Sequence, residues 1–511
     1  MKLEELTLRL KNKELPIDWP GHWLGGTWRP AERGELRSSM NPSRNSLLMS
    51  FKESKDVVEQ AINLAEEHQN EVAALSKSER IDIITRLAQA FADCQEPLIQ
   101  AMQLETGKPA WEARADMEAA LRHLNWVANH EDEIYESILA PAKIGAPRGE
   151  FSLAPVGITA GFLPFSTPVT SFVFYFTATA LTGCSLILVS STHASLSCLL
   201  FALIADKLDL PKGILNIVFG SYLSFKQTFS NKRIAGVLYT GSYEHCEEIK
   251  KSAAIKTGRQ LVMQSGGKNA VLVHSSADLN TAVRNIIYGV VKSSGQLCSS
   301  TSRVFVYRGI AKEFISLLSD SMDKIKIGAT DDFEDKTGPL MGPLYSKKAV
   351  DRFLRFQTMA HRAAKKTILW GKSLELDEGG SFVSPGIHLM EHYDSSNAYQ
   401  ENVIFCPDLS IYEYDVLDEA ITDINDTKSS LALSFIGERH IIDEKRHQVN
   451  APNILVNLPT VEVESTLPLA GRFSTGISRF HGPAMALYLC LPQIVQDDDV
   501  SRAIVNDWPY F

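Results

Sequence analysis

Apolar positions along this chain follow two alternating patterns. Short apolar runs predict β-strands, and longer stretches with apolar residues three and four positions apart predict the helices between them. The predicted strands are 156–163, 186–189, 214–218, 236–239, 270–273, 303–307 and 409–414. The predicted helices are 54–76, one that follows the Ser76-Lys-Ser-Glu79 capping box, 110–135, 194–208, 221–230, 279–294, 310–325, 346–364 and 416–426. Strands alternating with helices predict an α/β fold with a parallel, doubly wound sheet.

One stretch is long and apolar enough to raise the question of a membrane span. Residues 151–205 contain no Asp, Glu, Lys or Arg. Pro155, Pro164, Pro168 and Gly183 divide the stretch, and strands buried on both faces of a parallel sheet have this composition. We therefore expect buried strands and a helix here, and no membrane span.

The apolar segment 486–491 near the C-terminus predicts a strand that has no sheet of its own nearby in the sequence. An unpaired apolar strand is a candidate for edge pairing. We expect it to pair with another subunit.

Composition and charge narrow the classes of function. A chain of 511 residues can form two or three domains with large cores. Its net charge of −10 does not favour a nucleic-acid or anionic-membrane partner. The seven cysteines are far apart and form no Cys-x-x-Cys, which argues against a disulfide framework or a metal site and fits a cytoplasmic protein. The N-terminus has no apolar signal core, so we expect no targeting segment.

Five short motifs, in this order, resemble the aldehyde dehydrogenase superfamily over about residues 20–495. They are Glu105-Thr-Gly-Lys-Pro109, Leu238-Tyr-Thr-Gly-Ser242, Gly266-Gly-Lys268, Gly295-Gln-Leu-Cys298 and Phe405-Cys-Pro407. Segments 105–112 and 412–420 are most similar to the succinylglutamate semialdehyde dehydrogenase subfamily. The resemblance implies a Rossmann-type cofactor domain (1–135 and 155–262), an α/β catalytic domain (263–470) and a small β oligomerisation arm with a tail (136–154 and 480–511).

The resemblance also implies a chemistry, and three positions decide whether this chain can perform it. A thiolate attacks the aldehyde, an oxyanion hole holds the alkoxide, and a glutamate activates water to release the acid. Cys298 matches the nucleophile, although a buried cysteine can also be a small packing residue. Ser166 stands where the family has the oxyanion-hole Asn, and losing one such donor costs about 3–4 kcal/mol. Gln264 stands where the family has the base, and an amide cannot take a proton from water.

The positions that match the family's dinucleotide site are also altered. Val189 and Thr192 replace a Lys and a Glu that hold the adenosine ribose, and Val403 replaces the Glu that holds the nicotinamide ribose. Cys246 and Phe225 replace glycines, and both are expected to narrow the groove. The positions that keep a matching residue are Gly220, Gly241, Ser242 and Phe405. The expected cofactor is therefore NAD or NADP, if any, with doubtful binding.

Three functions remain open at this point. The first is NAD(P)-dependent oxidation of a small semialdehyde through a thiohemiacetal on Cys298, with weak or lost turnover. The second is a catalytically inactive homologue with a structural or regulatory role. The third is acyl transfer from the cysteine to another thiol such as coenzyme A. By analogy with the family we expect a homodimer or a higher homo-oligomer.

Overall fold

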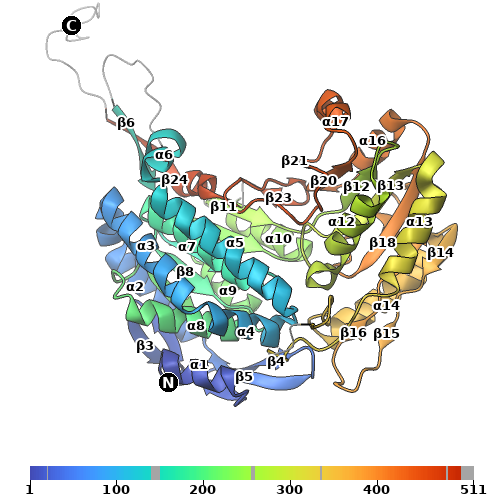
Figure 1. Ribbon diagram of the computed structural model, residues 1–511. Helices are drawn as coiled ribbons and strands as arrows, with labels where there is room; N and C mark the ends of the chain where they lie inside the picture. Colours follow the sequence, from blue (N-terminus) through green and yellow to red (C-terminus); the bar gives the residue numbers. More distant parts are fainter. Residues whose placement is uncertain (20, 140–149, 255–258, 334–336, 479–480, 496–511) are drawn as a thin grey trace, which may run out of the picture.

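The computed structural model describes residues 1–19, 21–139, 150–254, 259–333, 337–478 and 481–495. Figure 1 shows two lobes, each built around its own sheet with helices on both faces. The architecture is α/β, as the alternation of strands and helices predicts. The boundaries of the expected domains stay a prediction, and residues 140–149, 480 and 496–511 of the expected arm lie outside the described residues.

The first lobe holds an eight-stranded sheet. Its strands, in spatial order, are β23 (Gly476–Ile477), β11 (Gln260–Gln264), β10 (Gly236–Thr240), β7 (Thr159–Phe162), β8 (Leu186–Val189), β9 (Leu215–Val218), β2 (Gly21–Leu24) and β3 (Thr27–Pro30). The five strands from β11 to β9 are parallel, β23 and β2 on either side of them run antiparallel, and the edge strand β3 pairs antiparallel with β2. The carboxyl ends of the parallel strands therefore meet at one edge, which is where such sheets bind ligands.

Side chains that alternate along these strands face two separate cores. Leu186 and Leu188 of β8 pack with α3 (Lys77–Asp93), α4 (Gln95–Thr106), α5 (Ala110–Asn129), α7 (Pro168–Thr182) and α8 (Ser195–Lys207). Ile187 and Val189 pack on the opposite face with α2 (Lys55–Ala74), α9 (Tyr222–Ser230) and α10 (Tyr243–Ile249). The uncharged stretch thus forms interior strands and helices, and no helix in the described part of the chain is long and apolar enough to cross a membrane.

The second lobe holds a seven-stranded sheet. Its order is β14 (Lys366–Leu369), β17 (Gly386–Leu389), β18 (Asp408–Tyr414), β13 (Thr301–Tyr307), β12 (Asn269–Val273), β20 (Ala432–Ile436) and β21 (Asn453–Val456), all parallel except β14. One face packs on α12 (Leu279–Val291) and α13 (Arg308–Met322). The other packs on α14 (Lys347–Ala363), α15 (Ala398–Glu401), α16 (Leu417–Asn425) and α17 (Arg439–Lys445).

Several elements at the N-terminus and between the lobes were not predicted. Helix α1 (Leu3–Lys11) precedes a sheet of β1 (Ile17–Trp19), β5 (Ser46–Glu53) and β4 (Glu35–Asn41). Two short pairs follow later in the chain, β15 (Ser373–Leu374) with β16 (Phe382–Val383) and β19 (Ser429–Ser430) with β22 (Arg472–Phe473). Predicted helix 110–135 ends at Asn129 and is followed by α6 (Glu131–Glu133) and a π-helical turn, η1 (Ile134–Ile138).

The predicted strand 486–491 is wrong. Residues Pro483–Leu489 form a 3₁₀ helix, η5, and the strand β24 begins only at Cys490 and ends at Val495. Met485, Ala486 and Leu489 are fully buried, and the spacing of Ala486 and Leu489 suits the three-residue turn of a 3₁₀ helix. Strand β24 pairs antiparallel with β6 (Glu150–Pro155) of the same chain, and the two project together from the first lobe in Figure 1. Pairing with another subunit stays a prediction.

Candidate active site

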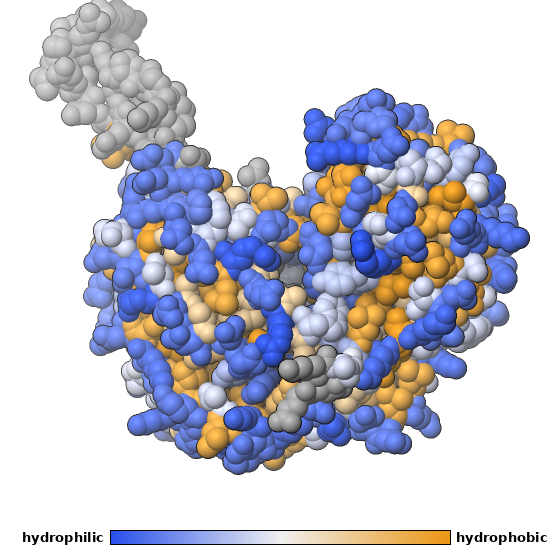
Figure 2. Space-filling view, viewed as in Figure 1, coloured by the Kyte–Doolittle hydropathy of each residue, from blue (hydrophilic) through white to orange (hydrophobic). Residues whose placement is uncertain are grey.

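A cavity of about 740 Å³ lies between the lobes, at the carboxyl ends of the parallel strands of the first lobe and at the amino ends of β12, β13 and β18 of the second. Figure 2 shows the molecular surface hollowed between the lobes. The first lobe contributes Ser166, Thr192, Gly241 and Ser242 to the lining, and the second contributes Cys298 and Phe405. The structure therefore brings six of the site residues predicted from sequence to one cavity.

The turn that leads to Cys298 has an unusual backbone. Ser293, Ser294 and Gly295 have φ values of 52°, 52° and 73°, a left-handed conformation that costs a non-glycine residue about 1–3 kcal/mol. At Gly295 a Cβ would lie 2.4 Å from the carbonyl carbon of Cys406, so only glycine fits. Ser294 Oγ donates to the carbonyl of Gly342 (2.9 Å), and Gln296 Nε2 donates to that of Ser293 (2.8 Å). These bonds hold the turn against its strain.

The main chain around the nucleophile is fixed by an asparagine that the sequence analysis missed. Asn269 Nδ2 donates to the carbonyls of Cys298 (2.9 Å) and Ser300 (2.8 Å), and its Oδ1 accepts from the amide of Ala432 (3.0 Å). Asn269 is the first residue of β12, directly after the Gly266-Gly-Lys268 motif. The available signal was a buried amide at the start of an otherwise apolar strand.

Cys298 is half-buried, and its thiol is neutral at pH 7. Burial raises the pKa of the Cys298 thiol to about 11, while the backbone N–H groups of Cys298 and Ser299 act in the opposite direction. His193 also lines the cavity, and burial lowers its pKa to about 4, so it is neutral as well. The thiolate is the reactive form, so at pH 7 Cys298 is mostly in its unreactive, protonated form.

Gln264 lies behind the cavity wall. It is the last residue of β11, is 1 % exposed, and is not among the residues that line the cavity. Its Nε2 donates to the carbonyl of Gly266 (3.3 Å), and a Cβ placed on Gly476 in the neighbouring β23 would lie 3.2 Å from its Oε1. The amide is thus bonded to its own segment and lies beside β23.

The structure separates the predicted cofactor positions into those that line the cavity and those that do not. Val189, Phe225 and Cys246 are buried together in the core beneath the sheet, and none of the three lines the cavity. Thr192, Gly241 and Ser242 do line it, and Ser242 caps α10 by accepting from the amide of His245 (3.3 Å). Gly220 packs against α9, because a Cβ there would lie 2.7 Å from Cβ of Ser224. The second-lobe position Val403 is half-buried beside Gly266, and Arg352, which also lines the cavity, donates to its carbonyl (3.0 Å).

Side chains of this chain fill the space between α9 and α10. The rings of Tyr222 and His245 stack with centroids 3.5 Å apart and planes 7° apart. Tyr222 Oη donates to Glu248 (2.9 Å), and Glu248 also pairs with Lys226. Tyr239 Oη lies 3.2 Å from Nδ1 of His245. The two helices are therefore bridged by their own aromatic and charged side chains.

The N-terminus of α9 already has an anion. Glu53 of β5 accepts from the amide (2.9 Å) and hydroxyl (2.5 Å) of Ser221, and from the amide (3.2 Å) and hydroxyl (2.7 Å) of Ser224. Burial alone would raise the pKa of Glu53, but these bonds and Arg37 lower it below its usual value. The N-terminus of a helix commonly binds phosphate through its free backbone amides. In α9 the amides of Ser221 and Ser224 instead donate to the Glu53 carboxylate.

These residues do not fit a dinucleotide in the way that the resemblance implies. Val189 and Val403 offer no polar group to a ribose. The Tyr222–His245 stack occupies the space between the helices, and Glu53 satisfies the donors of α9.

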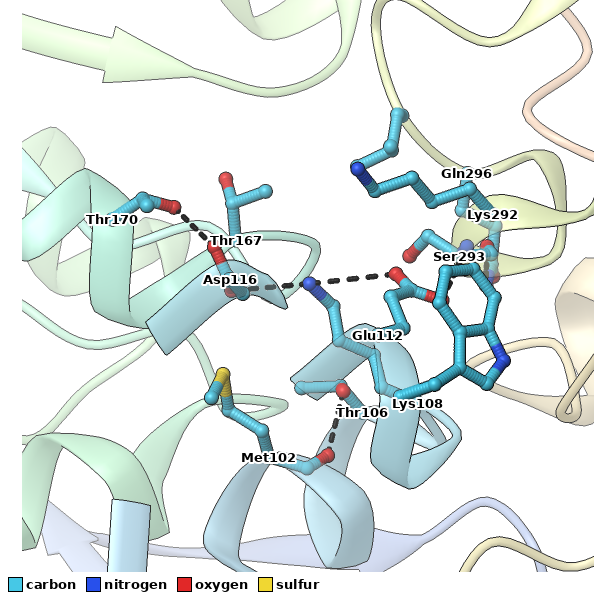
Figure 3. A network of polar contacts seen from close by, with 12 residues as sticks. Met102, Thr106, Lys108, Glu112, Asp116, Thr167, Thr170, Lys292, Ser293 and Gln296 are labelled. Atoms are coloured by element: carbon cyan, nitrogen blue, oxygen red, sulfur yellow. Dashed lines mark hydrogen bonds and ion pairs between the residues drawn. The ribbon is translucent and has the colours of Figure 1, made fainter. Parts of the chain in front are cut away.

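A buried charged cluster lines the opposite side of the cavity (Figure 3). The ammonium of Lys108 lies 3.1 Å from Asp116 Oδ2 and 3.5 Å from Glu112 Oε1. Asp116 Oδ1 accepts from Thr170 Oγ1 (2.6 Å), and Glu112 Oε2 accepts from the amide of Ser293 (2.7 Å). Sequence analysis used Lys108 and Glu112 only as parts of family-like segments and did not consider Asp116. The missed signal was the spacing of four between the three charges, which places Glu112 and Asp116 on successive turns of α5 and Lys108 just before its first turn.

Comparisons with known proteins give the family. The model of the aldehyde dehydrogenase family matches residues 28–494. A succinate-semialdehyde dehydrogenase (NADP+) of Escherichia coli K12 is 27 % identical over 414 residues, which is 81 % of this chain and 84 % of that protein. A D-glyceraldehyde dehydrogenase (NADP+) of Picrophilus torridus is 24 % identical over 95 % of this chain and 98 % of its own length.

Solved structures agree in fold. Lactaldehyde dehydrogenase from Escherichia coli superposes with a TM-score of 0.87 at 24 % identity, covering 94 % of this chain and 99 % of that one. A Mycobacterium tuberculosis aldehyde dehydrogenase complexed with NAD+ gives 0.88 at 19 % identity, covering 96 % and 100 %. The match to the family model spans nearly the whole chain, and the chain therefore belongs to the aldehyde dehydrogenase family.

Proposed function

We propose that this protein captures a small aldehyde on Cys298 as a thiohemiacetal, and that its NAD(P)-dependent oxidation of that adduct to a carboxylate is weak or lost. The observation that carries the proposal is Gln264, whose amide stands at the position of the family's base and is directed toward Gly266 and Gly476. The likeness of segments 105–112 and 412–420 to succinylglutamate semialdehyde dehydrogenases supports a semialdehyde as the substrate class.

The capture step needs only groups that line the cavity. The small thiolate fraction of Cys298 forms a carbon–sulfur bond with the carbonyl carbon, and the carbonyl oxygen becomes an alkoxide that takes a proton from solvent. The backbone N–H of Cys298 and the hydroxyl of Ser166 are the donors available to that oxygen. With no bound dinucleotide to accept a hydride, the adduct reverts to aldehyde and thiol. Any thioester that did form would be hydrolysed slowly, because the Gln264 amide cannot take a proton from water.

Capture is measured by protection from alkylation. A semialdehyde at millimolar concentration should slow the labelling of Cys298 by iodoacetamide, read by mass spectrometry of the peptide, and leave Cys94 unaffected. Cys298→Ser is the matched control for the assignment of the label. Absence of protection by any short aldehyde would contradict capture, and steady NADH production by the unaltered protein would contradict loss of turnover.

A second function, an inactive homologue with a structural or regulatory role, is favoured by the Tyr222–His245 stack. Acyl transfer to a thiol such as coenzyme A also begins with hydride removal, so the same stack counts against it. We further propose the domain division given by the family resemblance, a cytoplasmic location, and a homodimer or higher homo-oligomer formed through the β24 arm.

A further inference from the structure

We propose that Glu112 is a positioning residue for the nucleophile: its carboxylate, which belongs to the first lobe, holds the left-handed turn at Ser293 and so sets the orientation of the Cys298 thiol. The inference rests on the proposed role of Cys298 and goes beyond it, because nothing in the family's chemistry as described above assigns a task to Glu112.

The turn needs an external hold. Ser293 and Ser294 are consecutive non-glycine residues with φ of 52° each, and Cys298 follows only a few residues later. Ser294 and Gln296 are tied to Gly342 and Tyr345, both in the segment after α13. Among the described residues, the hydrogen bond from the Ser293 amide to the Glu112 carboxylate connects this turn to α5. Figure 3 shows Ser293 directly beside the Glu112 carboxylate.

Glu112 makes its best contact with the turn. The residue is fully buried, and Oε2 accepts from the Ser293 amide at 2.7 Å. Oε1 has no hydrogen-bond partner among the described residues and only the Lys108 ammonium at 3.5 Å, which Asp116 shares at the shorter distance of 3.1 Å. A buried carboxylate is costly unless it is well bonded. The bond to Ser293 is therefore the main contact that offsets the cost of burying this carboxylate.

The consequence reaches the sulfur through the main chain. The backbone N–H groups of Cys298 and Ser299 favour the charged form of the thiol. They follow in the chain directly after the turn Lys292–Gly295 that Glu112 holds. When the turn relaxes they move away from the sulfur, the thiolate fraction falls, and alkylation slows.

The test is the alkylation rate of Cys298 by iodoacetamide at fixed pH. Glu112→Leu removes the acceptor at similar size and should slow labelling of Cys298 at least threefold. Glu112→Gln keeps an acceptor oxygen and should stay within about twofold of the unaltered protein. Asp116→Asn weakens the pairing of Lys108 without touching Ser293, and it should also stay within about twofold.

Internal controls separate positioning from loosening of the fold. Cys184 and Cys198 are fully buried in the first lobe and should remain unlabelled in every variant. An unchanged or faster rate at Cys298 in Glu112→Leu would overturn the inference, and so would a parallel change at Cys184 and Cys198. If Glu112→Leu does not fold, Glu112→Asp replaces it. The shorter side chain keeps the charge but does not reach Ser293, so labelling of Cys298 should slow. A labelling rate equal to that of the unaltered protein would overturn the inference. Iodoacetamide needs neither aldehyde nor cofactor, so a failure of aldehyde capture leaves this result readable.

Discussion

Tyr222 and His245 lie face to face, 3.5 Å apart, and close the space between α9 and α10. The stack joins the helices that follow β9 and β10, two strands that β7 and β8 separate in the first sheet. This part of the cavity is thus shaped by contacts within the protein.

The melting temperature should not respond to dinucleotides. We expect no shift with 5 mM NAD or NADP, because the Tyr222–His245 stack occupies the space between α9 and α10. A dinucleotide present at a hundred times its Kd would add about 2.7 kcal/mol to the free energy of unfolding, which is easily measured. Thermal unfolding followed by fluorescence measures this directly. A clear stabilisation by either dinucleotide would show that the stack opens at little cost.

Removal of the stack should weaken the fold modestly. Tyr222→Ala loses an aromatic pair and the bond to Glu248, and we expect a loss of about 1–2 kcal/mol in the free energy of unfolding, measured with urea. Tyr222→Phe is the matched control, since it keeps the ring and should lose less than half as much. Equal losses in the two variants would locate the effect in the hydroxyl and not in the ring stack.

Gln264→Glu alone should not restore oxidation. The new carboxylate would face the carbonyl of Gly266, which now accepts from the amide, so two acceptors would meet in a buried place. We expect a loss of about 1–3 kcal/mol in stability and no NADH production with short aldehydes. Gln264→Met is the control for the lost hydrogen bond without added charge. NADH formation by the single variant would show that the side chain can turn into the cavity.

The contribution of Glu53 should depend on pH. Its folded pKa is lowered, so the stability it contributes is present above the unfolded pKa of 4.5 and is lost as pH falls through the folded value. We expect Glu53→Gln to cost about 1–2 kcal/mol at pH 7. Urea titrations at pH 7 and pH 3 should show the two proteins converging at the lower pH. A difference that persists unchanged at pH 3 would assign the effect to packing.

Alkylation of Cys298 should increase steeply with pH. With the pKa of the thiol at about 11, the rate rises about tenfold per unit between pH 7 and pH 10. A plateau near pH 8.5, the value of an ordinary thiol, would contradict the burial of the sulfur. Cys94 in the same sample provides the comparison.

The sequence predicted part of the interior of the fold, but the largely buried strands β11, β17 and β20 were missed. Strand 186–189 has the predicted bounds, and α2 and α9 are within two residues of theirs, because apolar periodicity records burial directly. The strands before Ser54 were missed, since segment 17–53 mixes polar and apolar residues on small edge sheets. Segment 486–491 was misassigned because a buried 3₁₀ turn and a strand share the same apolar composition.

Only the site residues that belong to a recognisable sequence motif could be predicted. Cys298 and Ser166 face one cavity, as their motifs indicate. No pattern along the chain could show that Tyr222 would stack on His245, because the contact joins two helices through their packing. The same holds for Glu112 and Ser293, which are far apart in sequence and meet only across the lobes.

Asn269 ties the position of Cys298 to the folding of the second lobe. Asn269, whose side-chain amide fixes the Cys298 carbonyl, is also the first residue of β12 and binds the amide of Ala432 in β20, so the position of the nucleophile is built into the pairing of these strand segments. The chain needs that pairing to fold, whatever reaction it catalyses. Selection for foldability alone is therefore sufficient to keep the cysteine in its place.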